Sequence, residues 1–85
     1  MLELRPNCEC CDKNLPADAP DALICSFECT FCSACRDKRL PGGRCPNCGG
    51  ELVRRPVRPP AKLAQFPASA QRVLKQHPGC APHRP

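Results

Sequence analysis

Eight cysteines in four pairs are the residues with which this sequence could do chemistry. They follow the order Cys8-x2-Cys11-x13-Cys25-x3-Cys29-x2-Cys32-x2-Cys35-x9-Cys45-x2-Cys48. Two residues between cysteines let one tight turn direct both sulfurs at one ion, and zinc accepts four thiolates in a tetrahedron. The spacing therefore predicts two closed four-cysteine sites holding two Zn2+ ions. Iron, which also accepts four thiolates, is the alternative metal.

The spacing allows two divisions of these eight cysteines. Sequential pairing would give one site of Cys8, Cys11, Cys25 and Cys29 and another of Cys32, Cys35, Cys45 and Cys48. Interleaved pairing would give a first site of Cys8, Cys11, Cys32 and Cys35 and a second of Cys25, Cys29, Cys45 and Cys48.

Cys10 and Cys80 stand outside the pairs. Cys10 directly precedes Cys11, a cramped spacing for holding one ion, so we expect it to be a spare thiol near the site. The tail carries His77-x2-Cys80-x2-His83, which has ligand-like spacing but only three donors, set among prolines. We expect this stretch to be a solvated tail rather than a third metal site.

Length and composition explain why metal is needed. The chain has 85 residues with ten Cys, three Phe and no Trp or Tyr, and a domain this small usually needs a metal or disulfides to supplement its core. No apolar run approaches the roughly 18 residues of a membrane span, and the first residues lack the apolar stretch of a secretory signal. We therefore expect a cytoplasmic protein with no membrane partner, whose reduced thiols favour metal over disulfides.

The distribution of cysteines, prolines and charges divides the chain into a zinc-binding domain, 1–53, and a Pro-rich basic tail, 54–85. Short strands are expected within 22–27 and 51–53, a helix over 33–40, and a core of Ile24, Phe27, Phe31, Leu40 and Leu52. Residues 1–51 have six basic and eight acidic side chains, whereas 52–85 have seven basic and none acidic. A short helix near 68–76 is expected in an otherwise flexible tail, either frayed or docked on the domain or a partner.

The ligand order, Phe31 before Cys32 and the C-P-x-C motif of Cys45 to Cys48 resemble a RING finger. The resemblance implies a small, metal-stabilised α+β fold: a RING-like cross-braced zinc finger of the treble-clef kind, with one short helix and short strands. It also implies the interleaved pairing, with Cys8, Cys11, Cys32 and Cys35 as site 1 and Cys25, Cys29, Cys45 and Cys48 as site 2. A usual RING has His near the fourth ligand, where this chain has Cys29.

Residues 2–56 resemble more closely a family of short, uncharacterised bacterial proteins. The shared motifs are LELRPNCExCDKxLP, ICSFECTFCxxC and CPNCGGELVRRP. This resemblance implies a bacterial, zinc-binding protein and carries no established activity.

Closed four-thiolate sites build a fold rather than activate water, so we expect no enzyme. We predict a monomeric structural zinc module that binds another macromolecule, with protein as the expected partner. One alternative is nucleic-acid binding through the basic tail residues Arg54, Arg55, Arg58, Lys62, Arg72, Lys75 and Arg84. Another is a redox or zinc-responsive regulator, because zinc thiolates are oxidisable and Cys10 would be a natural first target.

Overall fold

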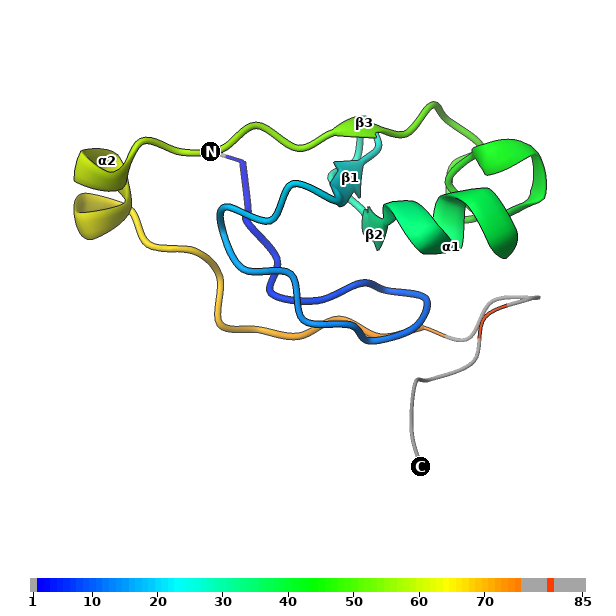
Figure 1. Cartoon of the computed structure of the whole chain (residues 1–85), viewed down its shortest axis with the longest axis horizontal. Coiled ribbons are helices and arrows are strands. Elements are labelled where there is room, and N and C mark those ends of the chain that lie inside the picture. The colour runs from blue at the N-terminus through cyan, green and yellow to red at the C-terminus, as the bar shows by residue number, and fades with distance from the viewer. Residues whose placement is uncertain (1, 76–79, 81–85) are drawn as a thin grey trace.

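A three-stranded antiparallel sheet lies at the centre of the computed structural model (Figure 1), which describes residues 2–75 and 80. The strands β1 (Ala22–Ile24), β2 (Thr30–Cys32) and β3 (Val53–Arg54) have the order β2-β1-β3. Leu23 of β1 is opposite Phe31 of β2 and Arg54 of β3. The fold is thus a small α+β arrangement, as predicted.

The helix α1 (Ser33–Lys38) follows β2 without a break, so Cys32 is both the last strand residue and the N-cap. Arg36 and Lys38 lie in its last turn, where cations favour the helix dipole. A 3-10 turn, η1 (Pro41–Gly43), follows and contains the positive-φ residue Gly42. The helix expected over 33–40 therefore exists and ends two residues early.

Two cysteine turns share one backbone pattern. The Cys8 and Cys45 N–H groups donate to the carbonyl five residues later, on Lys13 and Gly50, at 2.8 and 3.0 Å. Each of these cysteine carbonyls accepts the N–H four residues later, from Asp12 or Gly49. Both donors have positive φ, 65° and 74°, a conformation that only glycine adopts at no cost. The C-x-x-C spacing thus produces two equivalent turns, each of which brings its two cysteines close together.

The core is a single cluster of cysteines and small to medium apolar side chains. Four predicted core residues are buried: Ile24, Phe31, Leu40 and Leu52. Phe27 was predicted to join them, and that prediction is wrong, because its side chain is 72% exposed. The residue lies in the turn between β1 and β2, and its N–H donates to Cys25 Sγ at 3.3 Å. That bond fixes the backbone at the tip of the hairpin, where the ring is left in solvent.

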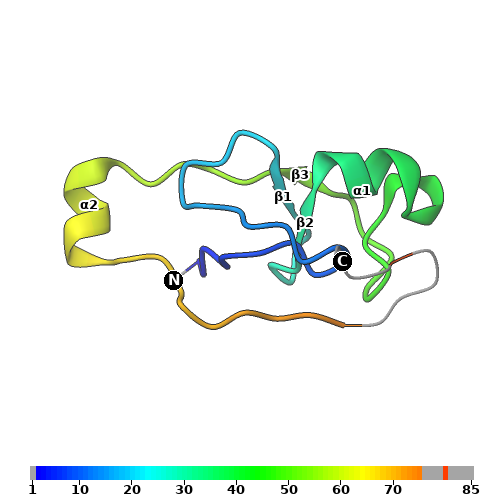
Figure 2. The same ribbon diagram turned by 60° about the horizontal axis from the view of Figure 1, so that its bottom comes forward.

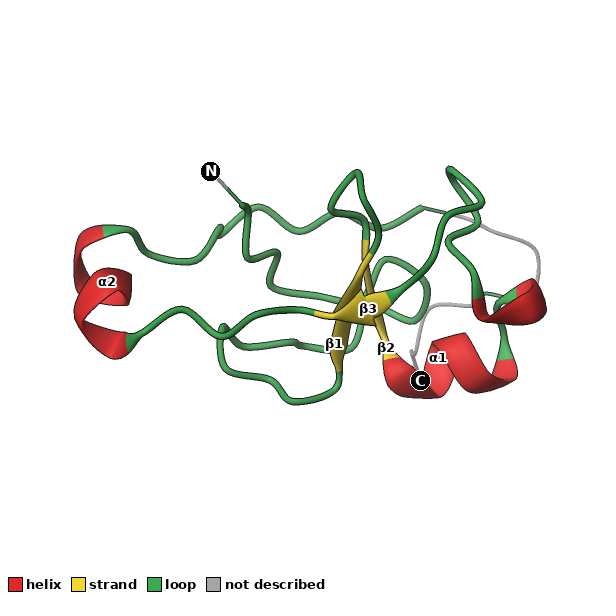
Figure 3. Cartoon of the chain, turned by 90° about the horizontal axis from the view of Figure 1, so that it is seen from above, coloured by secondary structure: helices red, strands yellow, loops and turns green. Residues whose placement is uncertain are grey.

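After β3 the chain makes a long excursion and returns. Helix α2 (Pro60–Gln65) lies at the opposite end of the molecule from α1. Residues 66–75 then run back beside residues 2–16 (Figure 2). We call residues 66–75 the strap and residues 2–16 the N-terminal segment. The helix expected near 68–76 is not found over its described part, 68–75, which is extended and irregular (Figure 3). A short isolated helix is marginal in water, and here the strap amides bond to the N-terminal segment instead.

Arg55, the residue after β3, is 1% exposed, and its buried side chain holds the N-terminal segment in place. Its guanidinium donates to the carbonyls of Arg5 at 2.8 Å and Pro16 at 2.9 Å. Its N–H donates to the Ala22 carbonyl at 2.8 Å. Burial lowers the pKa of this side chain. Contacts with the N-terminal residues therefore continue past residue 53, the last residue of the predicted zinc-binding domain.

Candidate metal centre

The first cysteine cluster combines one cysteine turn with the β2–α1 junction. Its sulfurs all lie within 4.8 Å of one another and belong to buried residues, namely Cys8, Cys11, Cys32 and Cys35. The Cys8–Cys35 and Cys11–Cys32 sulfur pairs are 3.7 and 3.8 Å apart. Four thiolates about 2.3 Å from a zinc ion have tetrahedral edges of about 3.8 Å. The donor set therefore fits a tetrahedral ion.

Hydrogen bonds and burial shift the pKa values of three thiols in this cluster. Cys8 Sγ accepts the N–H groups of Cys10 at 3.4 Å and Cys32 at 3.3 Å. Its side-chain hydrogen bond with Cys32 raises the pKa of Cys8 far above its usual range and lowers that of Cys32 to about 5. Burial raises the pKa of Cys35 to about 12. A bound cation would displace the protons that Cys8 and Cys35 hold, because the thiolate is the form that binds metal.

The second cluster brings together Cys25, Cys45 and Cys48, whose sulfurs also lie within 4.8 Å of one another. The structure does not bring Cys29 into this group, although its carbonyl accepts the Cys25 N–H at 3.2 Å. The Cys29 sulfur instead accepts Asn47 Nδ2–H at 3.3 Å. Its role as fourth ligand stays a prediction. The grouping of the other cysteines follows the interleaved pairing, since each cluster draws on non-adjacent pairs.

The pKa values of Cys25, Cys29 and Cys45 are also shifted. Burial raises the pKa of Cys45 to about 12 and also raises that of Cys29. Burial opposes ionisation of Cys25 too, but hydrogen bonds from the Phe27 and Cys29 N–H groups and from the Cys29 and Cys45 side chains together lower the Cys25 pKa. A backbone that donates to sulfur stabilises the thiolate form, which is the form that binds metal.

Glu9 connects the two clusters. It follows Cys8 in the chain and is buried. Its Oε2 accepts Asn47 Nδ2–H at 2.5 Å, and the same amide group reaches Cys29 Sγ. Its N–H donates to the Thr30 carbonyl at 2.9 Å. The sequence offered no indication of this link, because a lone Glu beside cysteines resembles any surface acid.

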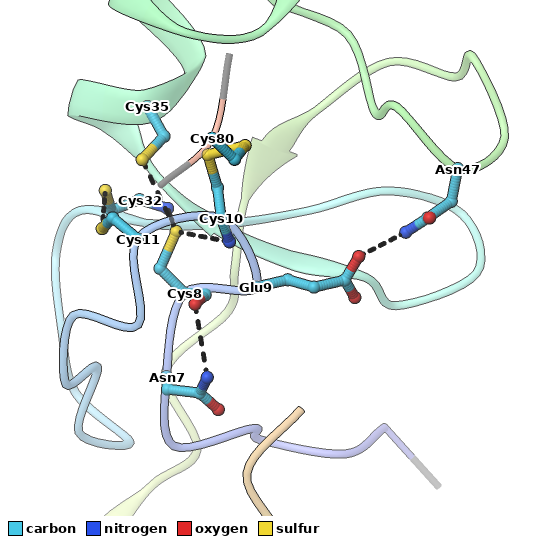
Figure 4. Close-up of a disulfide and its surroundings, with 9 residues drawn as sticks. All are labelled: Asn7, Cys8, Glu9, Cys10, Cys11, Cys32, Cys35, Asn47 and Cys80. Carbon is cyan, nitrogen blue, oxygen red and sulfur yellow. Dashed lines mark hydrogen bonds between the residues drawn. A yellow bond between two sulfur atoms is a disulfide. The ribbon is translucent and has the colours of Figure 1, made fainter. Parts of the chain in front are cut away.

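Cys10 forms a disulfide with Cys80 (Figure 4), across a sequence separation of 70 residues. The turn that directs Cys8 and Cys11 to the first cluster points Cys10 away from it, toward Cys80. Cys10 is 1% exposed, and Cys80 is partly buried against the core. The predicted spare thiol is thus paired in this structure. Of the predicted tail ligands, His77 and His83 lie outside the described residues.

Cations surround the first cluster. A surface cavity of about 370 Å3 is lined by three of its cysteines and by Lys13, Ala34, Lys38 and Arg39. Four thiolates and one divalent ion carry a charge of about −2. A metal bound there would place that charge beside the positive rim of this cavity, in which Lys13 is also paired with Asp21.

Several basic tail residues are engaged within the molecule. Arg72 bonds to Asn14 Oδ1 and Asp12 Oδ1, at 2.7 and 2.8 Å. Arg58 donates to the carbonyls of Leu2 and Phe66, and Arg55 is buried. The positive charge that suggested nucleic-acid binding is therefore used partly for internal contacts.

The fold and its clusters define a small cysteine-rich protein built around candidate metal sites. The chain belongs to the family described as protein of unknown function (DUF1272), whose model matches residues 1–58. It is 67% identical over 84 residues to the uncharacterized protein R02474 of Rhizobium meliloti (strain 1021), covering 99% of this chain and 98% of that bacterial protein. No solved structure matches the chain. No helix among the described residues is long and apolar enough to cross a membrane.

Proposed function

We propose that this protein is a structural zinc module, cytoplasmic and monomeric, that presents a rigid surface to a protein partner. The observation that carries the proposal is the closed, buried set of four sulfurs in the first cluster. Zinc is the proposed metal at both clusters because it has no geometric preference that conflicts with a tetrahedral sulfur set. Such a site leaves no open position for a substrate, so the role we propose is not enzymatic.

The second site would be completed by Cys29 in a RING-like, cross-braced arrangement. Cys25 and Cys29 lie at the two ends of one tight turn, joined by the Cys25 N–H bond to the Cys29 carbonyl. The Cys29 side chain already interacts with that of Cys25, and a shift away from Asn47 would bring its sulfur closer to Cys45 and Cys48. Native mass spectrometry of the full chain should then show two zinc ions per chain. One ion, or bound iron, would contradict the two-zinc proposal.

The surface that we propose for a protein partner is centred on Phe27. An aromatic ring exposed to 72% is unusual in a chain with three Phe, and exposed aromatics anchor many protein interfaces. Val53 of the neighbouring strand β3 is also exposed. Because the Phe27 backbone is bonded to Cys25, metal binding would hold the ring in a defined position.

The test of this surface uses two phenylalanines of the same chain. Phe27→Ala should abolish capture of a partner by the tagged, zinc-loaded protein, while Phe66→Ala at the end of α2 should leave capture unchanged. Both variants should keep two zinc ions and a native amide spectrum, because both rings are exposed. Equal capture by the Phe27→Ala variant and the unaltered chain would contradict the proposed surface.

A further inference from the structure

We propose that Cys10 and Cys80 are a reversible dithiol–disulfide site that reacts with hydroperoxides and thiol reductants, and that its state decides whether the strap stays on the N-terminal segment. The two residues are bonded across 70 positions of sequence, with Cα atoms 5.0 Å apart. Among the residues that the structure describes, neither belongs to a group of side chains that could hold a metal. The pair is therefore available for redox chemistry that the metal sites do not require.

Apart from this bond, the strap is held by polar contacts alone. Its side of the contact includes the Arg72 bonds to Asn14 and Asp12 and the Val73 carbonyl, which accepts Asn7 Nδ2–H at 2.9 Å. Three of its amides reach the N-terminal segment: Ser69 donates to the Leu4 carbonyl at 3.1 Å, Val73 to Asn7 Oδ1 at 3.1 Å, and Lys75 to the Glu9 carbonyl at 3.3 Å. No side chain between residues 56 and 75 is buried. A segment with few apolar contacts and exposed hydrogen bonds opens at little free energy. The disulfide adds a covalent link to these polar contacts, and we infer that this link decides how often the strap opens.

The same contacts explain why the disulfide forms within the chain. They hold the strap beside the Cys8–Cys11 turn, so the two thiols meet at a high effective concentration. Cys10 is enclosed, whereas Cys80 is partly exposed. An oxidant or reductant from solvent therefore reaches the Cys80 sulfur first.

The chemistry balances with named reagents. The Cys80 sulfur attacks one oxygen of hydrogen peroxide, the O–O bond breaks, and a sulfenic acid and one water form. The Cys10 sulfur attacks the sulfenic sulfur, the S–O bond breaks, and its oxygen leaves with two protons as a second water. Two electrons pass from the two sulfurs to the peroxide. A dithiol reverses the process in two exchanges. Its first sulfur attacks the Cys80 sulfur, forming a mixed disulfide and releasing the Cys10 thiolate; its second sulfur then attacks its first, which breaks the mixed disulfide, releases the Cys80 thiolate and leaves the reagent as its own disulfide.

The test uses the full chain with its metal bound, reduced with a phosphine and then given one equivalent of hydrogen peroxide. Intact mass should fall by two hydrogens with all metal retained, and peptide mapping should place the disulfide at Cys10 and Cys80. Loss of metal with oxidation of a cluster cysteine, such as the exposed Cys48, would overturn the proposal.

Amide exchange then tests the movement of the strap. In the oxidised protein the Ser69, Val73 and Lys75 amides should exchange about tenfold or more slowly than in the reduced protein. Cys80→Ser should match the reduced protein whether or not peroxide is added. The Leu63 amide, which donates to Pro59 within α2, is an internal control and should not change. Equal strap exchange in both redox states would overturn the proposed control of the strap.

Discussion

At the level of single residues, the sequence predicted the grouping of cysteines better than it predicted which side chains are buried. Cysteine spacing predicted two groups of sulfurs, because tight turns constrain neighbouring sulfurs strongly. The RING resemblance, and not the spacing, implied how the cysteines divide, and Cys29 is not among the three sulfurs of the second cluster. The surroundings of Phe27 and Arg55 followed from tertiary contacts instead. Phe27 was assigned to the core by hydrophobicity but is exposed, and Arg55 was assigned to a basic surface but is buried. No local pattern distinguishes Arg55 from Arg54, because its three carbonyl partners come from residues 5, 15 and 16.

These adjacent arginines provide a matched pair for testing stability. Arg55→Met should lower the free energy of unfolding by about 2–4 kcal/mol, because buried carbonyls lose charged donors. Arg54→Met should change it by less than about 0.5 kcal/mol, because that side chain is exposed. Urea denaturation of both metal-loaded variants measures the difference. Equal effects would show that the guanidinium bonds of Arg55 contribute little to stability.

At the level of elements, the parts next to cysteines were predictable and the parts held by distant contacts were not. The helix after Cys32 begins at Ser33 as expected and ends near Pro41 and its following glycines. The tail helix was expected near 68–76, whereas α2 is Pro60–Gln65, with Pro60 in its first turn. Residues 68–75 bond to the N-terminal segment, and that pairing cannot be inferred from local periodicity. The Cys10–Cys80 bond was missed for the same reason.

The cysteine turns can be tested at Gly49, where φ is +74° and an added Cβ would meet no atom within 4 Å. Gly49→Ala should therefore destabilise the metal-loaded protein through backbone strain alone, by about 1–2 kcal/mol. Gly49→Asn is the control, since Asn tolerates this conformation better and should cost less. Denaturation of the two variants at fixed zinc concentration ranks them. An Asn variant no more stable than the Ala variant would argue that the turn does not keep its positive φ.

At the level of the whole molecule, the sheet has three short strands. The hydrophobic core packs residues of this sheet against cysteines that range from Cys8 to Cys45. A core of this size supplies only a few kcal/mol. Structural zinc contributes an apparent 10–16 kcal/mol or so per site in small zinc-finger peptides at neutral pH. If zinc occupies the clusters, metal binding and folding are thus expected to be one equilibrium.

Metal removal should therefore unfold the domain rather than empty two sites in a persistent fold. A strong zinc chelator at pH 7 should collapse the dispersed amide spectrum, and the same chelator presaturated with zinc should have no effect.

Acid should act in the same direction, because every ligand must lose its proton to bind and falling pH returns those protons. The Cys10–Cys80 disulfide joins residues that both lie outside the clusters, so it should survive chelation and leave an unfolded but cross-linked chain. A three-stranded sheet that persists after complete metal loss would show that the apolar core, and not the metal, determines this fold.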